Sequence, residues 1–344
     1  MSSKGSGPAP ASARRPIAGE TELIQSYFAP LAKRGAPAFG LRDDAALYAP
    51  PPGHELVLTA DMLVEGVHVP QHAAPADFAY KALAVNVSDL VAKGADPALY
   101  LLTLCLPKHP EAGWLEAFTS GLSNAQADFG CSLAGGDTVS AEGPVCVSIT
   151  AAGIVPAGKM IHRFSANPGD KVFVTGTIGD AAAGLALIRK EISARPLSDE
   201  GEMRDFLLSR YFRPHPPVAA IELLRRHASA AMDISDGLVL DFTRLCAASG
   251  CGGVIEADCV PLSPAVTALL EGDAFSLEAA LTGGDDYEVL FTAAPGAADA
   301  IRSAAESRGL SLRCIGSIVR EPGITVVGRD GAPMQISKPG YDHF

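Results

Sequence analysis

The distribution of apolar residues along the 344-residue chain predicts two successive series of strands and helices. Short apolar runs are typical of buried strands, and apolar positions that recur every three to four residues are typical of helices. The predicted strands span residues 55–60, 100–106, 145–155, 171–175, 230–234, 253–257, 289–292 and 312–318. The predicted helices span residues 20–32, 81–93, 111–129, 179–188, 198–211, 217–226, 264–270 and 297–308. Strands that alternate with helices indicate an α/β chain (α+β mixed).

Residues 81–97 contain an apolar helix that polar side chains interrupt and that Gly94 and Pro97 end. Asn86, Asp89 and Lys93 share one stripe at helical spacing. The pattern leaves two interpretations open. The stripe is either a solvated face of a core helix or part of a charged site, where a buried Asp89 would need a cation or a donor.

Local composition divides the chain into a tail and two domains. Residues 1–16 are rich in Ser, Ala, Pro and Gly and lack the apolar core of a secretory signal, so we expect a disordered tail over 1–18. The Pro- and Gly-bearing segment 163–170 separates the two series of elements. We therefore expect an N-terminal α/β domain over 19–160 and a C-terminal α/β domain over 161–344.

Charge and cysteine content narrow the class of protein. A net charge of −12 argues against nucleic acid or a membrane surface as partner, so an anionic ligand would need metal ions as mediators. The chain has no run of about 18 apolar residues, so no membrane span is expected. Seven scattered cysteines without a CxxC pair fit a reduced cytoplasm.

Two glycine-containing segments resemble anion-binding loops. Residues 153–160 come close to a phosphate-binding P-loop, but Met160 replaces the required hydroxyl residue, and Ser165 to Pro168 follow too soon for the required helix. We reject this interpretation. Gly176 and Gly179 open the next helix, whose N–H groups either bind an anion or pack tightly, and packing is favoured.

Acidic residues recur beside glycine, serine or the ends of predicted strands. Each one alone also fits an ordinary turn or, for those at 43 and 44, a surface loop. Together they suggest one site for Mg²⁺ or Mn²⁺, because carboxylate oxygens without His or Cys partners select hard cations, and several such ions imply a polyphosphate substrate. The residues are Asp43, Asp44, Asp61, Asp89, Asp137, Asp233, Asp236 and Asp285. Gly-Gly-Asp occurs once in each half, which suggests that the halves are related α/β units.

Seven short motifs in chain order resemble the motif series of the thiamine-monophosphate kinase family. They are GLRDDAA, LTADMLVEGVH, KALAVNVSDLVAKGAD, LAGGDT, MDISDGL, TGGDDYE and the terminal GYDHF. This family shares its fold with aminoimidazole ribonucleotide synthetase, selenophosphate synthetase and a hydrogenase maturation factor. The resemblance implies a two-domain ATP-binding fold whose N-terminal sheet pairs with that of a second subunit in a homodimer.

The resemblance also implies roles for individual residues. The implied Mg²⁺ ligands are Asp44, Thr59, Asp61, Asp89, Asp137, Asp233 and Asp236. Gly136, Arg163 and Ser235, together with Asp44 and Asp137, would contact ATP, and Tyr100 matches an aromatic position beside the nucleotide. His68, Asp285 and Tyr341 would contact thiamine monophosphate, although on pattern alone a loop histidine is solvated and a terminal aromatic packs as a plug. Arg42 departs from the family, which has glycine there, so the geometry of this acidic loop can differ.

The implied reaction transfers the γ-phosphoryl group of ATP to thiamine monophosphate, which yields thiamine diphosphate and ADP without a general base. The chain lacks a cysteine before Cys105 and ends in Phe344, which argues against selenophosphate synthetase and the hydrogenase maturation factor. An activity like that of aminoimidazole ribonucleotide synthetase stays open as an alternative. A non-catalytic sensor that binds Mg²⁺ and nucleotide is a second alternative.

Overall fold

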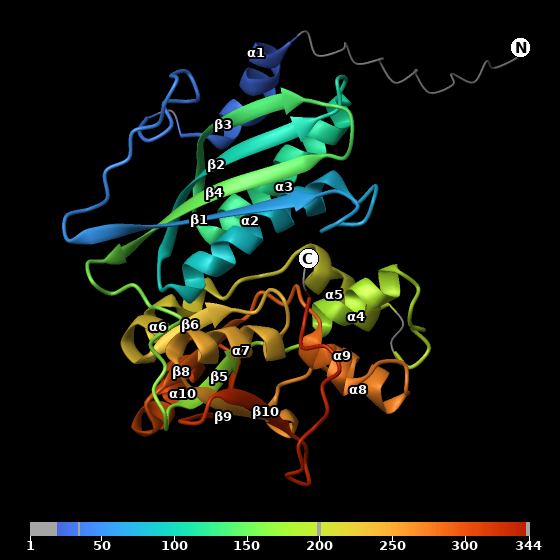
Figure 1. The fold of residues 1–344 in the computed structure, drawn as a ribbon. Coiled ribbons are helices and arrows are strands. Elements are labelled where there is room, and N and C mark those ends of the chain that lie inside the picture. Colours follow the sequence, from blue (N-terminus) through green and yellow to red (C-terminus); the bar gives the residue numbers. More distant parts are fainter. Residues whose placement is uncertain (1–18, 34, 198–200, 342–344) are drawn as a thin grey trace, which may run out of the picture.

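The structure is a computed structural model that describes residues 19–33, 35–197 and 201–341. It contains two mixed α/β domains, one above the other in Figure 1, each built on its own sheet. The expected fold class is confirmed. The tail predicted over 1–18 lies outside the described residues. The strands of the first sheet end at residue 156 and those of the second begin at 171, while the boundary at 160/161 stays a prediction.

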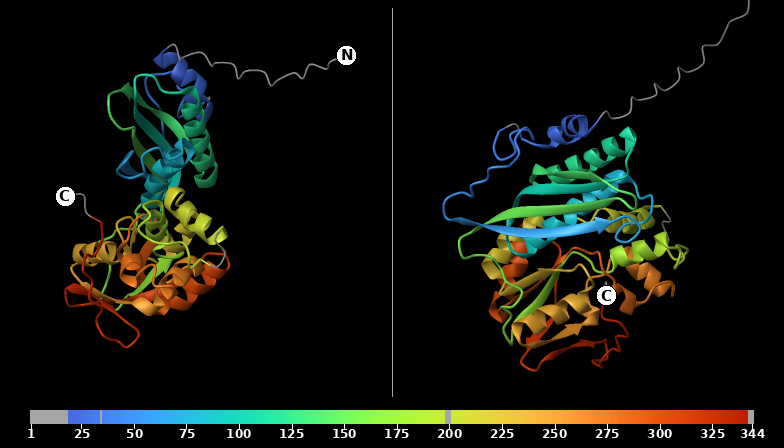
Figure 2. Two further views of the ribbon diagram at one scale, coloured as in Figure 1. Left: turned by 90° about the vertical axis from the view of Figure 1, so that its right-hand side faces the viewer. Right: turned by 45° about the horizontal axis from the view of Figure 1, so that its top comes forward.

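The first sheet has four strands in the order β1-β4-β2-β3. β4 pairs antiparallel with both neighbours, and β2 pairs parallel with β3. The strands are β1 (His54–Val64), β2 (Asp96–Leu106), β3 (Ser132–Ser140) and β4 (Cys146–Pro156). Helices α2 (Pro75–Ala92) and α3 (Ala112–Phe129) cover one face and leave the other open (Figure 2).

The side chains along the strands of the first sheet alternate between the two faces, which explains why helices cover only one face. In β1, Val57 and Leu63 are buried under the helices, whereas Leu58 and Met62 point to the open face and are 66% and 53% exposed. Successive strand residues face opposite sides, so a single strand supplies both a core face and a solvent face. The open face therefore carries an unusual amount of apolar surface.

The second sheet has six strands in the order β10-β7-β9-β5-β8-β6. They are β5 (Lys171–Thr175), β6 (Ala230–Asp233), β7 (Gly252–Glu256), β8 (Val289–Ala293), β9 (Leu312–Val319) and β10 (Gly323–Val327). Among the described strands of this sheet, only β7 and β10 pair parallel. On one face, stacked Phe173 and Phe291 join the core that continues into the first domain. On the other, Val172 and Val174 belong to a second core cluster that includes Phe242 of α7 (Leu238–Ser249).

The remaining helices surround the second sheet and the junction between the domains (Figure 1). They are α4 (Asp180–Ile188), α5 (Glu202–Phe212), α6 (Ile221–His227), α8 (Pro264–Glu271), α9 (Leu277–Thr282) and α10 (Ala298–Glu306). The N-terminal helix predicted over 20–32 is irregular, with α1 (Glu20–Leu23) continuing into π- and 3₁₀-helical turns. Within the described part of the chain, no helix is long and apolar enough to cross a bilayer.

The structure corrects two of the predicted elements. β1 extends to Val64 because it pairs with β4 along its full length, so Thr59 and Asp61 lie within the strand rather than at its end. Gly135, Gly136 and Asp137 form part of β3 rather than a turn, since their backbone pairs with β2. In both cases pairing with a strand distant in sequence overrode the local pattern.

Helix α2 begins earlier than predicted and lies at the junction between the domains. It contacts β1 and β4 of its own sheet as well as β6 and β8 of the second sheet. Of the predicted stripe, Asn86 is fully buried and Asp89 and Lys93 are partly buried, so the interpretation of a solvated polar face is wrong. Ser88 of this helix contacts Asp233 of the second domain, whereas Asn86 accepts from the backbone N–H of Asp61 in its own sheet.

Candidate functional site

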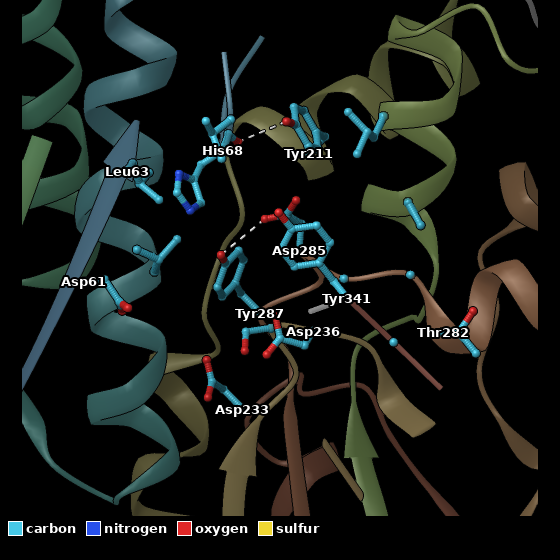
Figure 3. A pocket seen from close by; sticks show the side chains of 18 of the residues that line it. Asp61, Leu63, His68, Tyr211, Asp233, Asp236, Thr282, Asp285, Tyr287 and Tyr341 are labelled. Atoms are coloured by element: carbon cyan, nitrogen blue, oxygen red, sulfur yellow. Dashed lines mark hydrogen bonds between the residues drawn. The ribbon is translucent and has the colours of Figure 1, made fainter. Parts of the chain in front are cut away.

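A cavity of about 540 Å³ lies between the two domains. Strand β1, the loop that follows it and α2 line one side, and loops of the second domain line the other (Figure 3). The structure brings together here a large part of the predicted site. These residues are Asp61, His68, Asp89, Asp233, Ser235, Asp236, Asp285 and Tyr341.

The acidic residues of the cavity influence one another across the domain junction. Loss of water around Asp61 in the cavity wall, together with the charges of Asp89 and Asp236, raises the pKa of Asp61 to about 6. Burial and the charge of Asp89 raise the pKa of Asp233 well above its ordinary value. Neighbouring carboxylates repel one another when all are ionised, and a bound cation would remove this repulsion and stabilise their ionised forms.

Helix α2 holds this acidic group in place through hydrogen bonds. Thr59 Oγ1 donates to Asp89 Oδ2 at 2.5 Å, and Ser88 Oγ donates to Asp233 Oδ2 at 2.8 Å. Lys93 Nζ donates to the carbonyl oxygen of Ala231 at 2.7 Å. Burial lowers the pKa of Lys93, while the nearby charges of Asp233 and Asp89 oppose that shift. The predicted polar stripe therefore links the two domains beside the cavity.

The donor set fits a hard divalent cation, but it is not a closed cage. The side chains that meet here are carboxylates and hydroxyls, which are the ligands that Mg²⁺ prefers. Among the described residues, no three His, Cys, Asp or Glu side chains already stand close enough to hold an ion. Mg²⁺ keeps several water or phosphate ligands, so an open arrangement of carboxylates suits it.

Asp241, which is not among the predicted site residues, holds the shape of the loop 233–237. Asp241 Oδ2 accepts from the backbone N–H groups of Ser235 and Asp236 at 3.0 and 2.9 Å. Arg244 forms ion pairs with both Asp236 and Asp241. Asp241 lies in the first turn of α7, where a carboxylate that caps backbone donors is a recognisable sequence signal.

The segment 283–288 contains three acids with different surroundings. Asp285 faces the cavity, whereas Asp286 Oδ2 accepts from the backbone N–H of Gly179 at 2.8 Å. Glu288 accepts from Thr175 at 2.6 Å and pairs with Arg210 at 2.7 Å. Asp286 thus occupies the helix N-terminus that the sequence offered as an anion site, and the preference for packing there is supported.

The C-terminal segment reaches the cavity through a backbone contact. Tyr341 N–H donates to the carbonyl oxygen of Asp236 at 3.0 Å, and the Tyr341 side chain is 47% exposed in the cavity wall. A Cβ added to Gly340 would lie 2.6 Å from the same oxygen, so only glycine allows this approach. The residues that follow Tyr341 lie outside the described part of the chain.

His68 is tied into the loop after β1 rather than extended into solvent. Its Nδ1 accepts from the backbone N–H of Val64 at 3.0 Å, so a neutral ring carries its proton on Nε2. The hydroxyl of Tyr211 donates to the His68 carbonyl oxygen at 3.1 Å. The domain junction therefore fixes His68 at the cavity.

Other predicted site residues lie away from the cavity of this chain. Asp44 is exposed in the loop before β1, where Arg42 Nε donates to the Phe39 carbonyl oxygen at 3.3 Å. Gly136 and Asp137 lie on β3, with Asp137 on the open face of the first sheet. Thr59 reaches the cavity only through Asp89, and Arg163 is exposed in the connection between the sheets. Tyr100 is fully buried in the core, which does not support its expected position beside a nucleotide.

Sequence reasoning missed several residues that organise the cavity. Lys81 is fully buried, Tyr211 and Tyr287 line the wall, and Ser88 bonds Asp233. A lysine and a serine within an apolar helix were visible signals for Lys81 and Ser88. Tyr287 lies in the motif TGGDDYE, whereas Tyr211 gave no local signal, because its position depends on how the domains meet.

Comparisons with known proteins identify the family of this chain. Residues 42–155 match the family model of AIR synthase related protein, N-terminal domain, and residues 167–329 match that of the C-terminal domain. The thiamine-monophosphate kinase of Salmonella typhimurium is 40% identical over 328 residues, which cover 95% of this chain and 98% of that protein. The thiamine-monophosphate kinase of Escherichia coli is 39% identical with the same coverage.

Solved structures give the same relationship. The crystal structure of thiamine-monophosphate kinase from Stenotrophomonas maltophilia has a TM-score of 0.77 and 40% identity, and the match covers 86% of this chain and 91% of that one. The structure of AaThiL complexed with AMPPCP and TMP has a TM-score of 0.74 and 32% identity, with 86% and 89% covered. From the shared motifs, the two-domain fold and this similarity over nearly the whole chain, we conclude that the protein belongs to the thiamine-monophosphate kinase family.

Proposed function

We infer that this protein is an ATP-dependent kinase that converts thiamine monophosphate to thiamine diphosphate and releases ADP. The observation that carries this inference is the gathering of the motif carboxylates in one cavity between the domains. A family member with the same two-domain fold has been solved with AMPPCP and TMP. The transfer joins the γ-phosphoryl group of ATP to the phosphate of the acceptor.

The acceptor needs little chemical activation. A phosphate monoester has a second pKa near ~6, so at neutral pH it is mostly a dianion and needs no general base. The main obstacle is repulsion between two polyanions. The residues of the cavity therefore act by binding and alignment.

We propose that Asp61, Asp89, Asp233 and Asp236 hold Mg²⁺ in the cavity. When bound, Mg²⁺ would neutralise phosphate charge and align the reacting oxygens. The raised pKa of Asp61, caused by loss of water and by neighbouring carboxylates, supports this assignment, because a cation removes the repulsion. Thr59, which donates to Asp89, would hold that carboxylate in position.

Contacts with the two substrates are also proposals. Ser235, Gly136 and Arg163 would bind ATP, and His68, Asp285 and Tyr341 would bind thiamine monophosphate. Ser235, His68, Asp285 and Tyr341 line the cavity, which supports their share of the assignment. Gly136 and Arg163 rest on the motif resemblance.

We further propose that the protein forms a homodimer through the open face of the first sheet. Leu58, Met62 and Val139 are 66%, 53% and 48% exposed there, and large apolar side chains exposed on one face favour a protein partner. Asp137 lies on the same face, and Asp44 lies in the loop that leads into β1. Their proposed role as Mg²⁺ and ATP ligands therefore depends on the dimer. A monomer by light scattering at micromolar concentration would refute this proposal.

The expected cellular compartment is a separate proposal. All seven cysteines are free thiols in the structure. Free thiols persist in a reducing compartment, and we propose the cytoplasm.

Turnover with three acceptors in parallel tests the function. ATP and Mg²⁺ are incubated with thiamine monophosphate, thiamine or formylglycinamidine ribonucleotide, and the products are identified by mass. We expect thiamine diphosphate and ADP from the first reaction alone. Equal turnover of thiamine would contradict an acceptor phosphate held in the cavity. Turnover of the ribonucleotide would indicate the synthetase activity, and nucleotide binding without turnover of any acceptor would indicate a sensor.

A further inference from the structure

Lys81 is a fully buried lysine at the junction between the two domains. It lies on α2 with a side chain that is 0% exposed, and its Nζ is 2.9 Å from Asp285 Oδ1 of the second domain. The same Nζ lies 3.8 Å from the centre of the Tyr211 ring. An ammonium group without water is costly unless nearby groups stabilise it. A carboxylate and an aromatic face supply that stabilisation here.

The surroundings of Lys81 explain why its charge depends on Asp285. Burial lowers the pKa of Lys81, and the charge of Asp285 opposes that shift. Lys81 Nζ and Asp285 Oδ1 form an ion pair at 2.9 Å, and a hydrogen bond between the same two side chains also favours the charged lysine. Without the Asp285 carboxylate, burial would therefore favour the neutral amine of Lys81.

The contacts of Asp285 fix one of its two carboxylate oxygens. Lys81 Nζ and the Tyr287 hydroxyl, at 2.9 and 3.2 Å, both contact Oδ1. The Asp285 backbone is held as well, because its N–H donates to the carbonyl oxygen of Ser235 at 2.8 Å, with φ at 72° in the left-handed region that is uncommon for residues other than glycine. With Oδ1 engaged and the side chain 26% exposed at the cavity, Oδ2 is the oxygen that a ligand can meet.

Tyr211 connects this ion pair to the other side of the cavity. Its ring covers Lys81, and its hydroxyl donates to the carbonyl oxygen of His68. Figure 3 shows His68, Tyr211 and Asp285 around the same opening. Lys81 and Tyr211 thus hold the two candidate recognition residues, His68 and Asp285, at a fixed separation across the junction.

We propose that Lys81 is a positioning residue for the acceptor substrate: it fixes Asp285 Oδ1 so that Oδ2 faces the cationic thiamine part of thiamine monophosphate. This inference rests on the proposed kinase function and adds a residue to its substrate recognition. Lys81 is fully buried and does not line the cavity, so it acts on the substrate through Asp285 rather than by direct contact. The substrate would supply the second positive group beside the carboxylate.

Lys81→Met removes the charge and keeps a long apolar side chain. We expect KM for thiamine monophosphate to rise by at least about tenfold, as when one partner of a buried charge pair is removed. The values of kcat and of KM for ATP should stay within about threefold, because Lys81 touches no reacting atom. A general loss of folding would instead change the amount of active enzyme and leave each KM unchanged.

Arg225→Met is the matched control. Arg225 also joins the two domains, with Nη2 2.6 Å from Asp96, but neither residue lines the cavity. We expect this variant to keep KM for thiamine monophosphate within about twofold of wild type. An equal rise of KM in both variants would overturn the proposal, because loosened docking of the domains would then explain the effect.

A double-mutant cycle with Asp285→Asn completes the test. If Lys81 acts through Asp285, adding Lys81→Met to Asp285→Asn should change KM for thiamine monophosphate by less than about twofold. Additive effects would refute the proposal. This comparison also decides the matter if Lys81→Met alone fails to fold. Wild-type enzyme in the same assay distinguishes failure of the proposed kinase function from failure of the proposed role of Lys81. If the wild type shows no turnover, the kinase function itself is contradicted.

Discussion

The tripeptide Gly-Gly-Asp occurs twice in the chain, and its two copies have different structures. Gly135, Gly136 and Asp137 lie within β3, and a Cβ on Gly136 would stand 1.8 Å from the Leu102 carbonyl oxygen of the neighbouring strand. Asp137 points to the open face of the first sheet. In this copy the glycine permits close pairing of two strands.

The second copy lies in a loop at the cavity. A Cβ on Gly284 would stand 2.4 Å from the Ser235 carbonyl oxygen, and one on Gly283 would stand 2.2 Å from the Cβ of Ala182. Asp285 faces the cavity and pairs with buried Lys81. The shared tripeptide therefore indicates close approach of the backbone to a neighbour in both copies. It does not show that the two halves of the chain are equivalent, and it does not tell which acid faces a ligand.

Asp89→Asn should have the largest effect on activity. Asp89 lies in the cavity at the centre of the acidic group, and the amide keeps the shape but removes the proposed metal-binding charge. We expect kcat to fall by about 100-fold or more at saturating Mg²⁺, which steady-state kinetics measures. Asp137→Asn, in the other acidic region, should also lower kcat if the open face joins the site in a dimer. A kcat near that of wild type for Asp89→Asn would show that Asp89 is not a required Mg²⁺ ligand and has only a structural role.

Substitution of the two glycines should test the shared reason for the tripeptide. Gly136→Ala and Gly284→Ala each place a Cβ against a carbonyl oxygen, so each should lower the free energy of unfolding by about 1–3 kcal/mol or more. Chemical denaturation measures this change. Gly113→Ala is the control, since nothing lies within 4 Å of its added Cβ in α3 and alanine favours a helix. Equal stability of all three variants would show that close approach is not the constraint.

Tyr341→Ala should have a moderate effect that is specific to one substrate. Thiamine carries a permanent positive charge, and an aromatic face binds such a cation by about 0.5–2 kcal/mol. This corresponds to a rise of about two- to thirtyfold in KM for thiamine monophosphate, with KM for ATP unchanged. Tyr341→Phe should change little. A lower melting temperature with both KM values raised would instead identify the C-terminal aromatic segment as a packing element.

Arg42→Gly should have the smallest effect. Arg42 is exposed and its Nε contacts the Phe39 carbonyl oxygen, so restoring the glycine that the family has there should keep kcat/KM within about twofold or raise it. The same assay of purified wild type and variant measures this. A loss beyond about tenfold would show that Arg42 has acquired a role in the acidic loop.

The hydrophobic pattern predicted most elements of the second domain closely. The strand expected over 171–175 spans those residues, and the strand expected over 312–318 extends over one further residue. Short strands buried on both faces leave a continuous apolar run, which is readable without knowledge of the neighbours. β10 and α9 were not predicted. β10 is an edge strand of the second sheet, and α9 has only six residues, so the local signals for both were weak.

The sequence by itself determined the fold class, the motif series and the choice of oxygen donors, because these depend on residue type, spacing and apolar periodicity. Only the tertiary structure decided which acids meet. Asp61 and Asp233 share a cavity because α2 brings the two sheets together, while Asp137 projects from the opposite face of the first sheet. The burial of Lys81 beside Asp285 likewise depends on contacts between residues about two hundred positions apart, which local sequence does not encode.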